Sequence, residues 1–473
     1  MLFNRQSFVS IAFALLLALF GHSIIRSEET RAAKKPNFII IFCDDLGYSD
    51  IGCFGSKLHR TPNIDSMASQ GTKFTNFYVT SGVCSPSRSS LMTGCYPRRV
   101  NLHQDHSGQW VLFPRGKRGL NPEETTIAEV LKDTGYATGI IGKWHLGDQP
   151  SFLPTRQGFD YYFGIPYSND MGHDSRSEPY RYPPLPLMRN EEVIEQEPDQ
   201  RQITQRYTQE AVRFIKAHQD EPFFLYLPHT MPHWPQYASE QFAGKSNNGK
   251  WGDAVEEIDW STGVILESLK ELKLDQNTLV IFTSDNGGAT RHGAHNEPLK
   301  GGKGSTFEGG QRVCNVMRWP GKIPEGKECG ELVTSMDLLP TFAALAGTSP
   351  PPDVTIDGKN IEQLIQGHAG VKSPHEAFYY YFRETLECVR SGKWKLRLAQ
   401  VRGGEKMKFP QLFDLENDIG ESQNLAEKHP EIVQKLIDLA SIARQDLGDG
   451  KQTGLGQRPA CFVENARGLT DPK

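Results

Sequence analysis

The run Asn37-Phe-Ile-Ile-Ile-Phe42 is apolar from Phe38 onward and stops just before a pair of acidic residues, Asp44-Asp45. Three later runs share this design: residues 137–142 before Lys143 and His145, residues 223–227 before His229 and His233, and residues 278–283 before Asp285 and Asn286. Runs rich in β-branched and aromatic residues, without polar alternation, are typical of strands covered on both faces. The four runs therefore predict the buried centre of a sheet.

Helical patterns lie between these runs, over residues 124–132, 203–218 and 254–272. Alternating strands and helices favour an α/β fold built on a large, mixed but mostly parallel sheet flanked by helices. Ligands of such sheets bind beyond the carboxyl ends of the strands. We therefore expect the polar residues that end the four runs to share one site.

The composition is that of an ordered globular protein. Of 473 residues, 37% are apolar and 23% are charged. Asp and Glu (57) outnumber Lys and Arg (52), which gives a net charge of −5 and a pI near 6.3. This length suits one large core with an appendage. Because there is no basic excess, DNA or RNA binding is not expected.

The N-terminal residues are expected to be a targeting signal and not part of the folded domain. Arg5 precedes a 13-residue apolar run, residues 8–20, and small or polar residues follow it. This order is typical of a secretory signal peptide, which we assign to residues 1–27. The alternative is a membrane anchor, since extending the run to Ile25 gives 18 residues, the lower edge of a spanning length. Polar residues at 21–23 interrupt the run, so we expect cleavage, export to the periplasm or the exterior, and no membrane attachment afterwards.

Three carboxylates, those of Asp44, Asp45 and Asp285, would share one pocket if the strand ends converge. Like charges at close range are unstable without a cation. Together with Asn286 they form an all-oxygen donor set, which favours a hard ion, Ca²⁺ or Mg²⁺, over Zn²⁺. Each motif also has a simpler interpretation, because Asp-Asp and Asp-Asn-Gly after strands are common turns. The repetition at four strand ends favours the metal site.

The segment Cys84-Ser-Pro-Ser-Arg-Ser-Ser-Leu-Met-Thr-Gly94 combines a cysteine with a helix start. Ser85 and Pro86 predict the first turn of a helix, which would put Cys84 at the positive helix end, a place suited to an anion. Arg88, four residues on, is spaced to lean back toward Cys84. Two alternatives stay open: a structural cysteine before a short helix, and a thiolate nucleophile whose pKa the helix end lowers.

This segment resembles the signature of type I sulfatases, an alkaline-phosphatase-like family in which the cysteine is oxidised after synthesis to formylglycine. The matching residues are Cys84-x-Pro86-Ser87-Arg88 and Leu91-Met-Thr-Gly94. Other segments of the family are matched by residues 44–50 and 284–287 (metal), 142–147 (Lys/His), and 302–310 (distal lysine loop). Residues 164–170 and the lysine loop look closest to arylsulfatase A-like and N-acetylgalactosamine-6-sulfatase-like members. Cys95 departs from the family, in which many members carry a basic residue there.

The resemblance implies a role for each matching residue. The positions that bind one Ca²⁺ in the family correspond to Asp44, Asp45, Asp285, Asn286 and the modified Cys84. The catalytic positions correspond to Cys84 itself, Arg88 holding the formylglycine, Lys143 and His145 beside it, Lys303 gripping the sulfate, and His233. We choose His233 over His229 because Trp-Pro follows it, as in the family's His-x-Pro pattern. Ser168 falls on a position that can contact sulfate.

The resemblance also implies a mechanism, in which the hydrated formylglycine is a geminal diol. One hydroxyl, activated by the metal and by Asp285, attacks sulfur to form a sulfo-enzyme. The alcohol then leaves, protonated by His233 or Lys303. His145 takes the proton of the second hydroxyl, so that sulfate departs and the aldehyde re-forms. The metal and the neighbouring cations neutralise the transferring group.

These matches predict an exported sulfatase that acts on sulfate monoesters, either of a sulfated carbohydrate or of aryl alcohols. Its expected maturation partner is a formylglycine-generating enzyme. One alternative is a phosphatase or phosphonate monoester hydrolase of the same superfamily. The other is a catalytically silent protein that binds sulfated glycans, which would apply if Cys84 is never converted.

Residues 36–370 are predicted to form the catalytic domain, and residues 371–473 a smaller subdomain. Alternating patterns predict antiparallel strands over residues 377–382, 387–390, 394–399 and 412–415, followed by a helix over about 430–446. This matches the C-terminal four-stranded sheet and helix of the family. The loop at residues 167–200 is rich in Pro, Tyr and Arg. Its Arg176, Arg181 and Arg189 suit a sulfated sugar or, equally, a solvated flap.

Eight cysteines are present, an even number that would suit four disulfides in an exported protein. If Cys84 becomes formylglycine, seven remain, and seven cannot all pair within one chain. We therefore interpret the cysteines as one catalytic position among mostly structural ones. Cys43, at the end of a buried run, is expected to be a small core residue.

Overall fold

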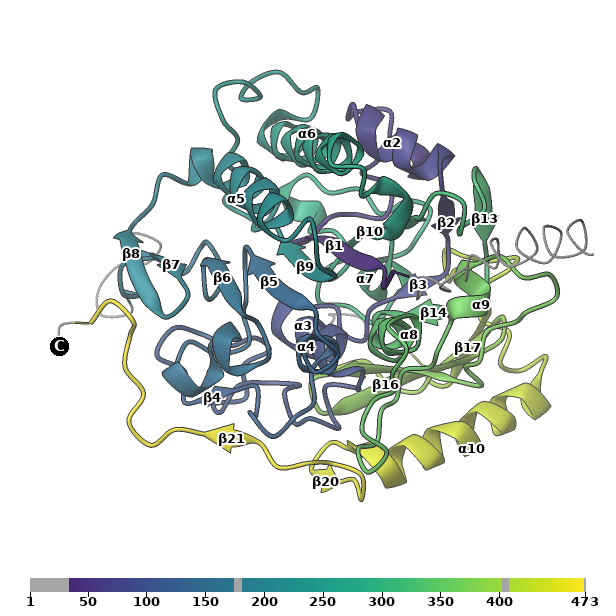
Figure 1. Cartoon of the computed structure of the whole chain (residues 1–473). Helices are drawn as coiled ribbons and strands as arrows, with labels where there is room; N and C mark the ends of the chain where they lie inside the picture. Colours follow the sequence, from purple (N-terminus) through teal and green to yellow (C-terminus); the bar gives the residue numbers. More distant parts are fainter. Residues whose placement is uncertain (1–33, 174–180, 402–407, 472–473) are drawn as a thin grey trace, which may run out of the picture. The chain divides into compact units, whose positions relative to one another are not determined.

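The strand β1 (Asn37–Cys43) lies in the middle of a ten-stranded sheet in the computed structural model, which describes residues 34–173, 181–401 and 408–471 (Figure 1). Its neighbours β10 (Thr278–Ser284) and β9 (Phe223–Pro228) run parallel to it, and β5 (Ala137–Ile141) runs parallel to β9. These are the four predicted strands, and their apolar side chains are buried because helices cover both faces of the sheet.

The outer strands make the sheet mixed. On one side β6 (Tyr161–Gly164) is parallel to β5, and β7 (Pro186–Arg189) and β8 (Glu192–Gln196) follow antiparallel. On the other side come β12 (Asn315–Arg318), β2 (Thr72–Phe74) and β13 (Lys327–Cys329). The five central strands are all parallel, so the predicted mixed, mostly parallel sheet is confirmed.

Helices form a layer on each face of the sheet (Figure 1). One apolar core joins the sheet to α2 (Pro62–Ser69), α5 (Ile203–Ala217) and α6 (Gly249–Glu271). The other joins it to α3 (Cys84–Thr93), α4 (Ile127–Lys132) and α8 (Leu338–Leu345). Helix α4 begins three residues later than predicted because Thr126 caps it, in a reciprocal capping box with Glu129. Helix α6 begins five residues earlier than predicted.

Short elements fill the loops of this unit. They are β3 (Phe77–Tyr78), β4 (Arg118–Gly119), β11 (Arg312–Val313), β14 (Val333–Thr334), β19 (Gly448–Asp449), β20 (Gln452–Thr453), α7 (Glu308–Gln311) and α9 (Glu362–Ile365). Strand β3 lies between β11 and β14 in a small three-stranded sheet. Its neighbour α7 closes the lysine loop predicted from the sequence, residues 302–310.

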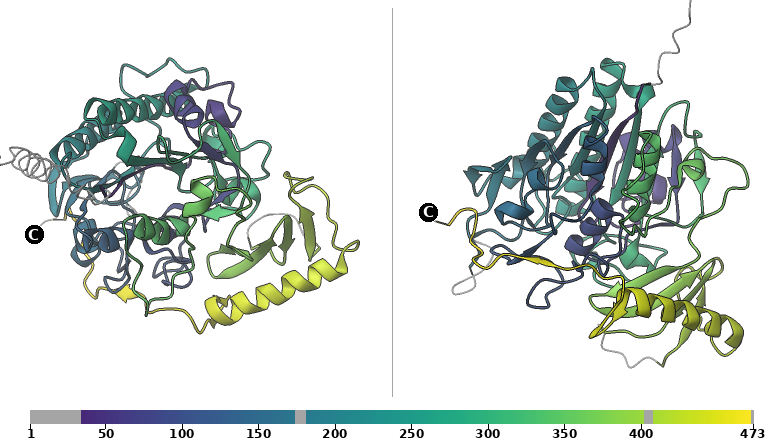
Figure 2. Two further views of the ribbon diagram at one scale, coloured as in Figure 1. Left: turned by 45° about the vertical axis from the view of Figure 1, so that its right-hand side comes forward. Right: turned by 60° about the horizontal axis from the view of Figure 1, so that its bottom comes forward.

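A second, antiparallel sheet follows toward the C-terminus (Figure 2). Its order is β15 (Phe378–Phe382), β16 (Thr385–Ser391), β17 (Trp394–Arg397) and β18 (Gln411–Asp414), and α10 (Pro430–Leu447) packs on it. The chain then returns, and β21 (Cys461–Phe462) pairs with β4. The small sheet and helix are as predicted, and the division of the chain between residues 370 and 371 stays a prediction.

All eight cysteines lie in the described ranges, and none forms a disulfide there. Cys43 is fully buried at the end of β1, as expected for a core residue. Within these ranges, no helix combines the length and the apolar character that crossing a bilayer requires. The predicted signal peptide, residues 1–27, lies outside the described residues.

Candidate active site

Strand register brings the predicted site residues to one edge of the sheet. Cys43 at the end of β1 is level with Ser284 at the end of β10, and the amide of Asp285 donates to the Cys43 carbonyl at 3.0 Å. The amide of Lys143, just beyond β5, donates to the Pro228 carbonyl at 2.7 Å. The acidic residues and Lys143 therefore leave neighbouring strand ends at the same level, as the sequence predicts.

The backbone bends sharply where the side chains turn into the site. Asp45 and His145 both adopt left-handed conformations, with φ of 68° and 64°, which cost energy for residues other than glycine. Gly142 precedes Lys143 with φ of 135°, and a Cβ there would lie 1.9 Å from the Pro228 carbonyl oxygen. Only glycine fits at that position, and its turn is what directs Lys143 inward.

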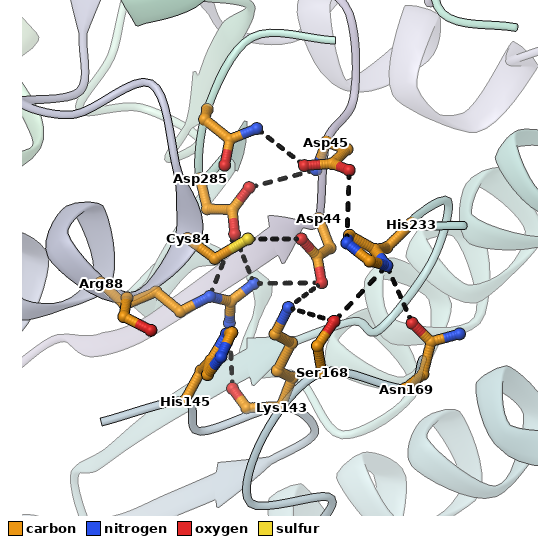
Figure 3. A network of polar contacts seen from close by, with 12 residues as sticks. Asp44, Asp45, Cys84, Arg88, Lys143, His145, Ser168, Asn169, His233 and Asp285 are labelled. Carbon is orange, nitrogen blue, oxygen red and sulfur yellow. Dashed lines mark hydrogen bonds and ion pairs between the residues drawn. The ribbon is translucent and has the colours of Figure 1, made fainter. Parts of the chain in front are cut away.

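The acidic residues converge around a space suited to a cation (Figure 3). Ligand atoms of Asp44, Asp45, Cys84 and His233 lie within 4.8 Å of one another. Asp285 Oδ1 accepts from the Asp45 amide at 3.1 Å, and Asn286 Nδ2 donates to Asp45 Oδ1 at 2.8 Å. Burial and then the Asp44 charge raise the pKa of Asp285 to about 7, which reflects the crowding of carboxylates.

A hard cation fits this donor set. Asn286 Oδ1 is buried and has no hydrogen-bond donor within the described residues, so an oxygen ligand is available there. Carboxylate and amide oxygens are the ligands that Ca²⁺ prefers. A cation would also relieve the repulsion among Asp44, Asp45 and Asp285.

Each carboxylate is paired with a cationic side chain, and Asp44 also lies 3.8 Å from Arg88. Arg88 reaches Asp285 Oδ2 through Nε at 3.0 Å and Nη2 at 2.8 Å. Lys143 Nζ lies 2.5 Å from Asp44 Oδ2, and Lys303 Nζ lies 2.6 Å from Asp45 Oδ2. Three negative charges therefore face three positive charges. A bound divalent cation would leave the site with a surplus of about two positive charges, which attracts an anionic substrate.

Cys84 is the first residue of α3 and is 2% exposed. Its Sγ donates to Asp44 Oδ1 at 3.4 Å. Burial, and then the Asp44 carboxylate, raise the pKa of the thiol well above its ordinary value. A plain thiolate nucleophile therefore does not suit this pocket. The guanidinium of Arg88 lies beside Cys84 (Figure 3), where it donates to Asp285 and, from Nη1, to the Lys143 carbonyl at 3.0 Å.

His145 is buried with one ring nitrogen occupied. Its Nε2 lies 2.9 Å from the Leu112 carbonyl and must donate to it, so in the neutral ring Nδ1 carries the lone pair. Nδ1 is buried and has no partner in the described part of the chain. Burial, and then Lys143 and Arg88, lower the pKa of His145 well below its usual value. The ring is thus a neutral base with a free acceptor.

His233 and His145 lie on opposite sides of the acidic residues (Figure 3). Its Nε2 lies 3.6 Å from Asp45 Oδ2, and its Nδ1 lies 3.0 Å from Asn169 Oδ1. Ser168 Oγ lies 3.2 Å from Lys143 Nζ and 3.5 Å from His233 Nδ1. His229 is instead buried against α6, with Nε2 3.5 Å from Ser261 Oγ. The choice of His233 over His229 is therefore consistent with the geometry.

Asn169 is the residue that the sequence interpretation missed. It fixes the ring of His233, although its only sequence signal is its place after Ser168 in residues 164–170. Of the arginines in the 167–200 loop, Arg176 lies outside the described residues. Arg189 pairs with Glu210 on α5 at 3.0 Å, so its charge is already used.

The lysine loop rests on the C-terminal sheet through a buried charge cluster. We call this the Lys395 cluster and define it as Lys395, Arg397, Glu308 and Glu421. Lys395 Nζ lies 2.9 Å from Glu308 and 2.9 Å from Glu421, and it donates to the Thr306 carbonyl at 2.8 Å. The cluster ties β17 to the segment that carries Lys303 into the site, five residues before Glu308.

The chain matches known proteins over most of its length. Residues 36–348 match the sulfatase family, and residues 302–444 match the family described as N-sulphoglucosamine sulphohydrolase, C-terminal. Human arylsulfatase A is 38% identical over 457 residues, which cover 87% of this chain and 88% of the relative. N-acetylgalactosamine-6-sulfatase of Canis lupus familiaris is 36% identical over 456 residues, covering 88% and 86%.

A solved structure extends this likeness to three dimensions. The crystal structure of Ps i-CgsB in complex with k-i-k-neocarrahexaose has a TM-score of 0.75 at 33% identity, and the match covers 86% of this chain and 92% of that chain. The predicted alkaline-phosphatase-like fold class and the resemblance drawn from residues 84–94 are both confirmed. The chain belongs to the sulfatase family, whose members are sulfuric ester hydrolases.

Proposed function

We propose that this chain is an exported sulfatase that hydrolyses sulfate monoesters of carbohydrates, with one Ca²⁺ and with Cys84 converted to formylglycine. The observation that carries the proposal is the position of Cys84. It opens α3 beside Asp44, within a segment that has the full Cys-x-Pro-Ser-Arg pattern, at the edge where three carboxylates and three cations meet.

Ca²⁺ would be held by Asp44, Asp45, Asp285, Asn286 and the modified residue 84. When bound, it supplies positive charge next to the sulfate oxygens and to the nucleophile. The hydrated aldehyde of residue 84 supplies two hydroxyls on one carbon, one to attack sulfur and one whose deprotonation releases sulfate. A serine or an unmodified cysteine has no second hydroxyl for that release.

The remaining steps belong to side chains of this protein. Lys143, Lys303 and Arg88 lie where they would neutralise the charge that develops on the transferring sulfuryl group. His145 Nδ1, neutral and free to accept, suits the base that takes the proton from the second hydroxyl. His233 or Lys303 would give a proton to the leaving alcohol.

Several observations support a carbohydrate substrate. One relative is by name an N-acetylgalactosamine-6-sulfatase, and the similar solved structure holds a neocarrahexaose. The first name refers to a sulfated sugar and the second to a bound oligosaccharide, whereas arylsulfatase A is named for aryl sulfates. Export is inferred from residues 1–27, and the maturation partner that converts Cys84 would be a formylglycine-generating enzyme.

Two alternatives are tested by the same experiments. Turnover of 4-nitrophenyl sulfate and 4-nitrophenyl phosphate is compared, before and after chelation. A sulfatase prefers the sulfate, and a phosphatase or phosphonate hydrolase the phosphoryl ester. Absence of turnover, with binding of sulfated sugar retained, would instead indicate a glycan-binding protein.

The mass of the tryptic peptide that contains Cys84 tests the modification directly. Conversion replaces the sulfur and two hydrogens by one oxygen, so the peptide becomes lighter. Cys84→Ala should abolish turnover, and Cys84→Ser should at most accumulate a sulfated protein. Cys461→Ala serves as the matched control, since Cys461 lies in β21 and belongs to none of the site contacts described above. Normal turnover by Cys84→Ala would refute the proposed nucleophile.

A further inference from the structure

The residue after His233 is a tryptophan that faces solvent. Trp234 is 48% exposed, whereas His233 itself is 8% exposed. The Trp234 ring stacks on His292, with ring centroids 5.6 Å apart and planes 24° from parallel. Large exposed aromatic side chains held in a fixed orientation are typical of recognition surfaces. The indole therefore offers one flat, apolar face beside a residue of the site.

His292 places this aromatic pair at the rim of the site. His233 directly precedes Trp234, and the turn Thr290–His292 closely follows Gly288, whose carbonyl accepts from the Lys303 amide at 3.1 Å. Partial burial lowers the pKa of His292. At neutral pH the imidazole is therefore uncharged and stacks as an aromatic ring.

A groove of about 450 Å³ lies next to Trp234. It is lined by polar side chains with aromatic ones: Asn169, Asp170, Asp199, Gln200, Trp234 and Tyr237. Asn169 lines the groove and also contacts His233 in the candidate active site. Its Oδ1 accepts from His233 (Figure 3). Its Nδ2 donates to Gln200 Oε1 at 2.9 Å and to the Pro235 carbonyl at 3.1 Å.

The groove has the hydrogen-bonding character of a site for hydroxyl groups. Carboxylates of Asp170, Glu197 and Asp199 line it. Asp199 is paired with Arg201 at 2.8 Å, and Glu197 Oε1 accepts from two backbone amides. Asp170 Oδ1, in contrast, is buried with no hydrogen-bond partner in the described part of the chain. Carboxylates and amides accept and donate to sugar hydroxyls, whereas they repel a second sulfate or a uronate. This acidic lining contrasts with the cations around Cys84, so the two neighbouring spaces favour different charges.

We propose that Trp234 and this groove form a subsite for one uncharged sugar residue, linked to the sugar that bears the scissile sulfate. The apolar face of that sugar ring stacks on the indole, and its hydroxyls bind the polar groove. This subsite rests on the proposed function, because it requires a glycan sulfate as the substrate. It adds a preference for the neighbouring sugar that the sulfate-binding residues do not impose.

The test compares substrates that differ only in the neighbouring sugar. The probes are galactose monosulfates, the disaccharides that carry an uncharged galactose beside the same sulfated galactose, and the disaccharides that carry a uronic acid there. For the sulfate position that is turned over, kcat/KM is measured for all three probes. The wild-type enzyme is expected to prefer the uncharged disaccharide over both other probes.

The readout in variants is the ratio of kcat/KM for the uncharged disaccharide to that for the monosaccharide, because any general loss of activity cancels in it. Trp234→Ala is expected to lower this ratio by roughly two- to tenfold, the size of one aromatic stacking contact. Trp234→Phe keeps a ring and should recover most of the ratio. Phe462→Ala, which removes another exposed aromatic ring (54% exposed) on β21, should leave it unchanged.

An unchanged ratio in Trp234→Ala would overturn the subsite, as would a wild-type enzyme that gains nothing from the uncharged neighbour. Failure to turn over any of these sugar sulfates, while 4-nitrophenyl sulfate is hydrolysed, would also overturn it. If 4-nitrophenyl sulfate is not hydrolysed either, the proposed function falls with it. The two failures are therefore told apart by one additional substrate.

Discussion

Replacing Lys395 by methionine should lower the free energy of unfolding, although Lys395 contacts none of the catalytic or metal-binding side chains described above. Lys395 is fully buried, and its Nζ is the shared partner of the carboxylates of Glu308 and Glu421. Methionine keeps an apolar stem of similar length and removes only the charge. The change therefore isolates the electrostatic contribution of the Lys395 cluster from its packing.

The magnitude follows from what each carboxylate loses. Burial opposes the ionisation of Glu308, but Lys395, followed by Arg390 and Arg312, lowers its pKa to about 2. Without Lys395, Glu308 keeps the Tyr380 hydroxyl at 2.9 Å and Arg312 at 3.7 Å, while Glu421 keeps Arg397 at 3.8 Å. Removing one partner of a buried pair costs about 3–5 kcal/mol, and these residual contacts place the loss near 3 kcal/mol.

The assay is thermal unfolding at neutral pH, followed by turnover of 4-nitrophenyl sulfate well below the transition. At about 2 °C per kcal/mol for a large domain, the transition should fall by about 6 °C. Lys393→Met is the matched control, since Lys393 is partly exposed and pairs with Asp414 at 2.7 Å near the start of the same strand. Because water screens the partly exposed Lys393 charge, its loss should lower the transition far less.

A double variant tests whether the lost stability comes from the unpaired carboxylate of Glu421. Adding Glu421→Gln to Lys395→Met removes the least compensated carboxylate, so part of the lost stability should return. If Lys395→Met unfolds at the same temperature as Lys393→Met, the cluster does not hold the lysine loop by charge. Equal stability of the single and double variants would refute the assigned role of Glu421.

Three further outcomes are expected. Chelation should abolish turnover and lower the unfolding temperature, and Ca²⁺ at 100 times its Kd should restore about 2.7 kcal/mol; unchanged stability and activity after chelation would exclude the metal site. Because the pKa of His145 is lowered, the neutral base persists as pH falls through 6.5, so any loss of kcat/KM caused by its protonation should lie below pH 6.5. A His145-dependent limb centred above 6.5, identified by its disappearance in His145→Ala, would contradict this. Arg88→Lys loses the two-pronged contact with Asp285 and should lower kcat/KM by about 10²–10³-fold with an unchanged circular dichroism spectrum, whereas wild-type kinetics would show that Arg88 does not orient the site.

The parts of the fold that were predictable are those written in local patterns. The four central strands are continuous apolar runs, so β1, β5, β9 and β10 could be placed within a residue or two. The edge strand β8 was not predicted because its residues alternate between exposed and half-buried, and none of them is buried as in the continuous apolar runs. The start of α4 was misplaced although Thr126 and Glu129 carry a readable capping box.

The site also contains residues that local sequence patterns predict and residues that they do not. Asp44, Lys143 and Asp285 end predicted strands, so their convergence follows from the parallel order of the sheet. Asn169 lies in a loop, and no local sequence pattern predicts that its side-chain Oδ1 will accept a hydrogen bond from His233. The Lys395 cluster was also out of reach, because buried charges distant in sequence become partners only after two sheets have packed together.

The C-terminal residues pack on the first half of the chain, and this packing limits the time during which Cys84 is accessible. Every residue of α3 is buried, and contacts from the last residues made hold the segment that follows it: Arg99 with Asp446 at 2.5 Å, and Glu124 with Arg458 at 2.6 Å. At 5–20 residues per second, roughly 20–75 s separate the synthesis of Cys84 from that of Arg458. Any enzyme that must grip an extended Cys84 segment has that interval, and whatever delay folding adds, in which to act. A variant whose tail closes faster would shorten this interval, so its Cys84 would be less completely converted.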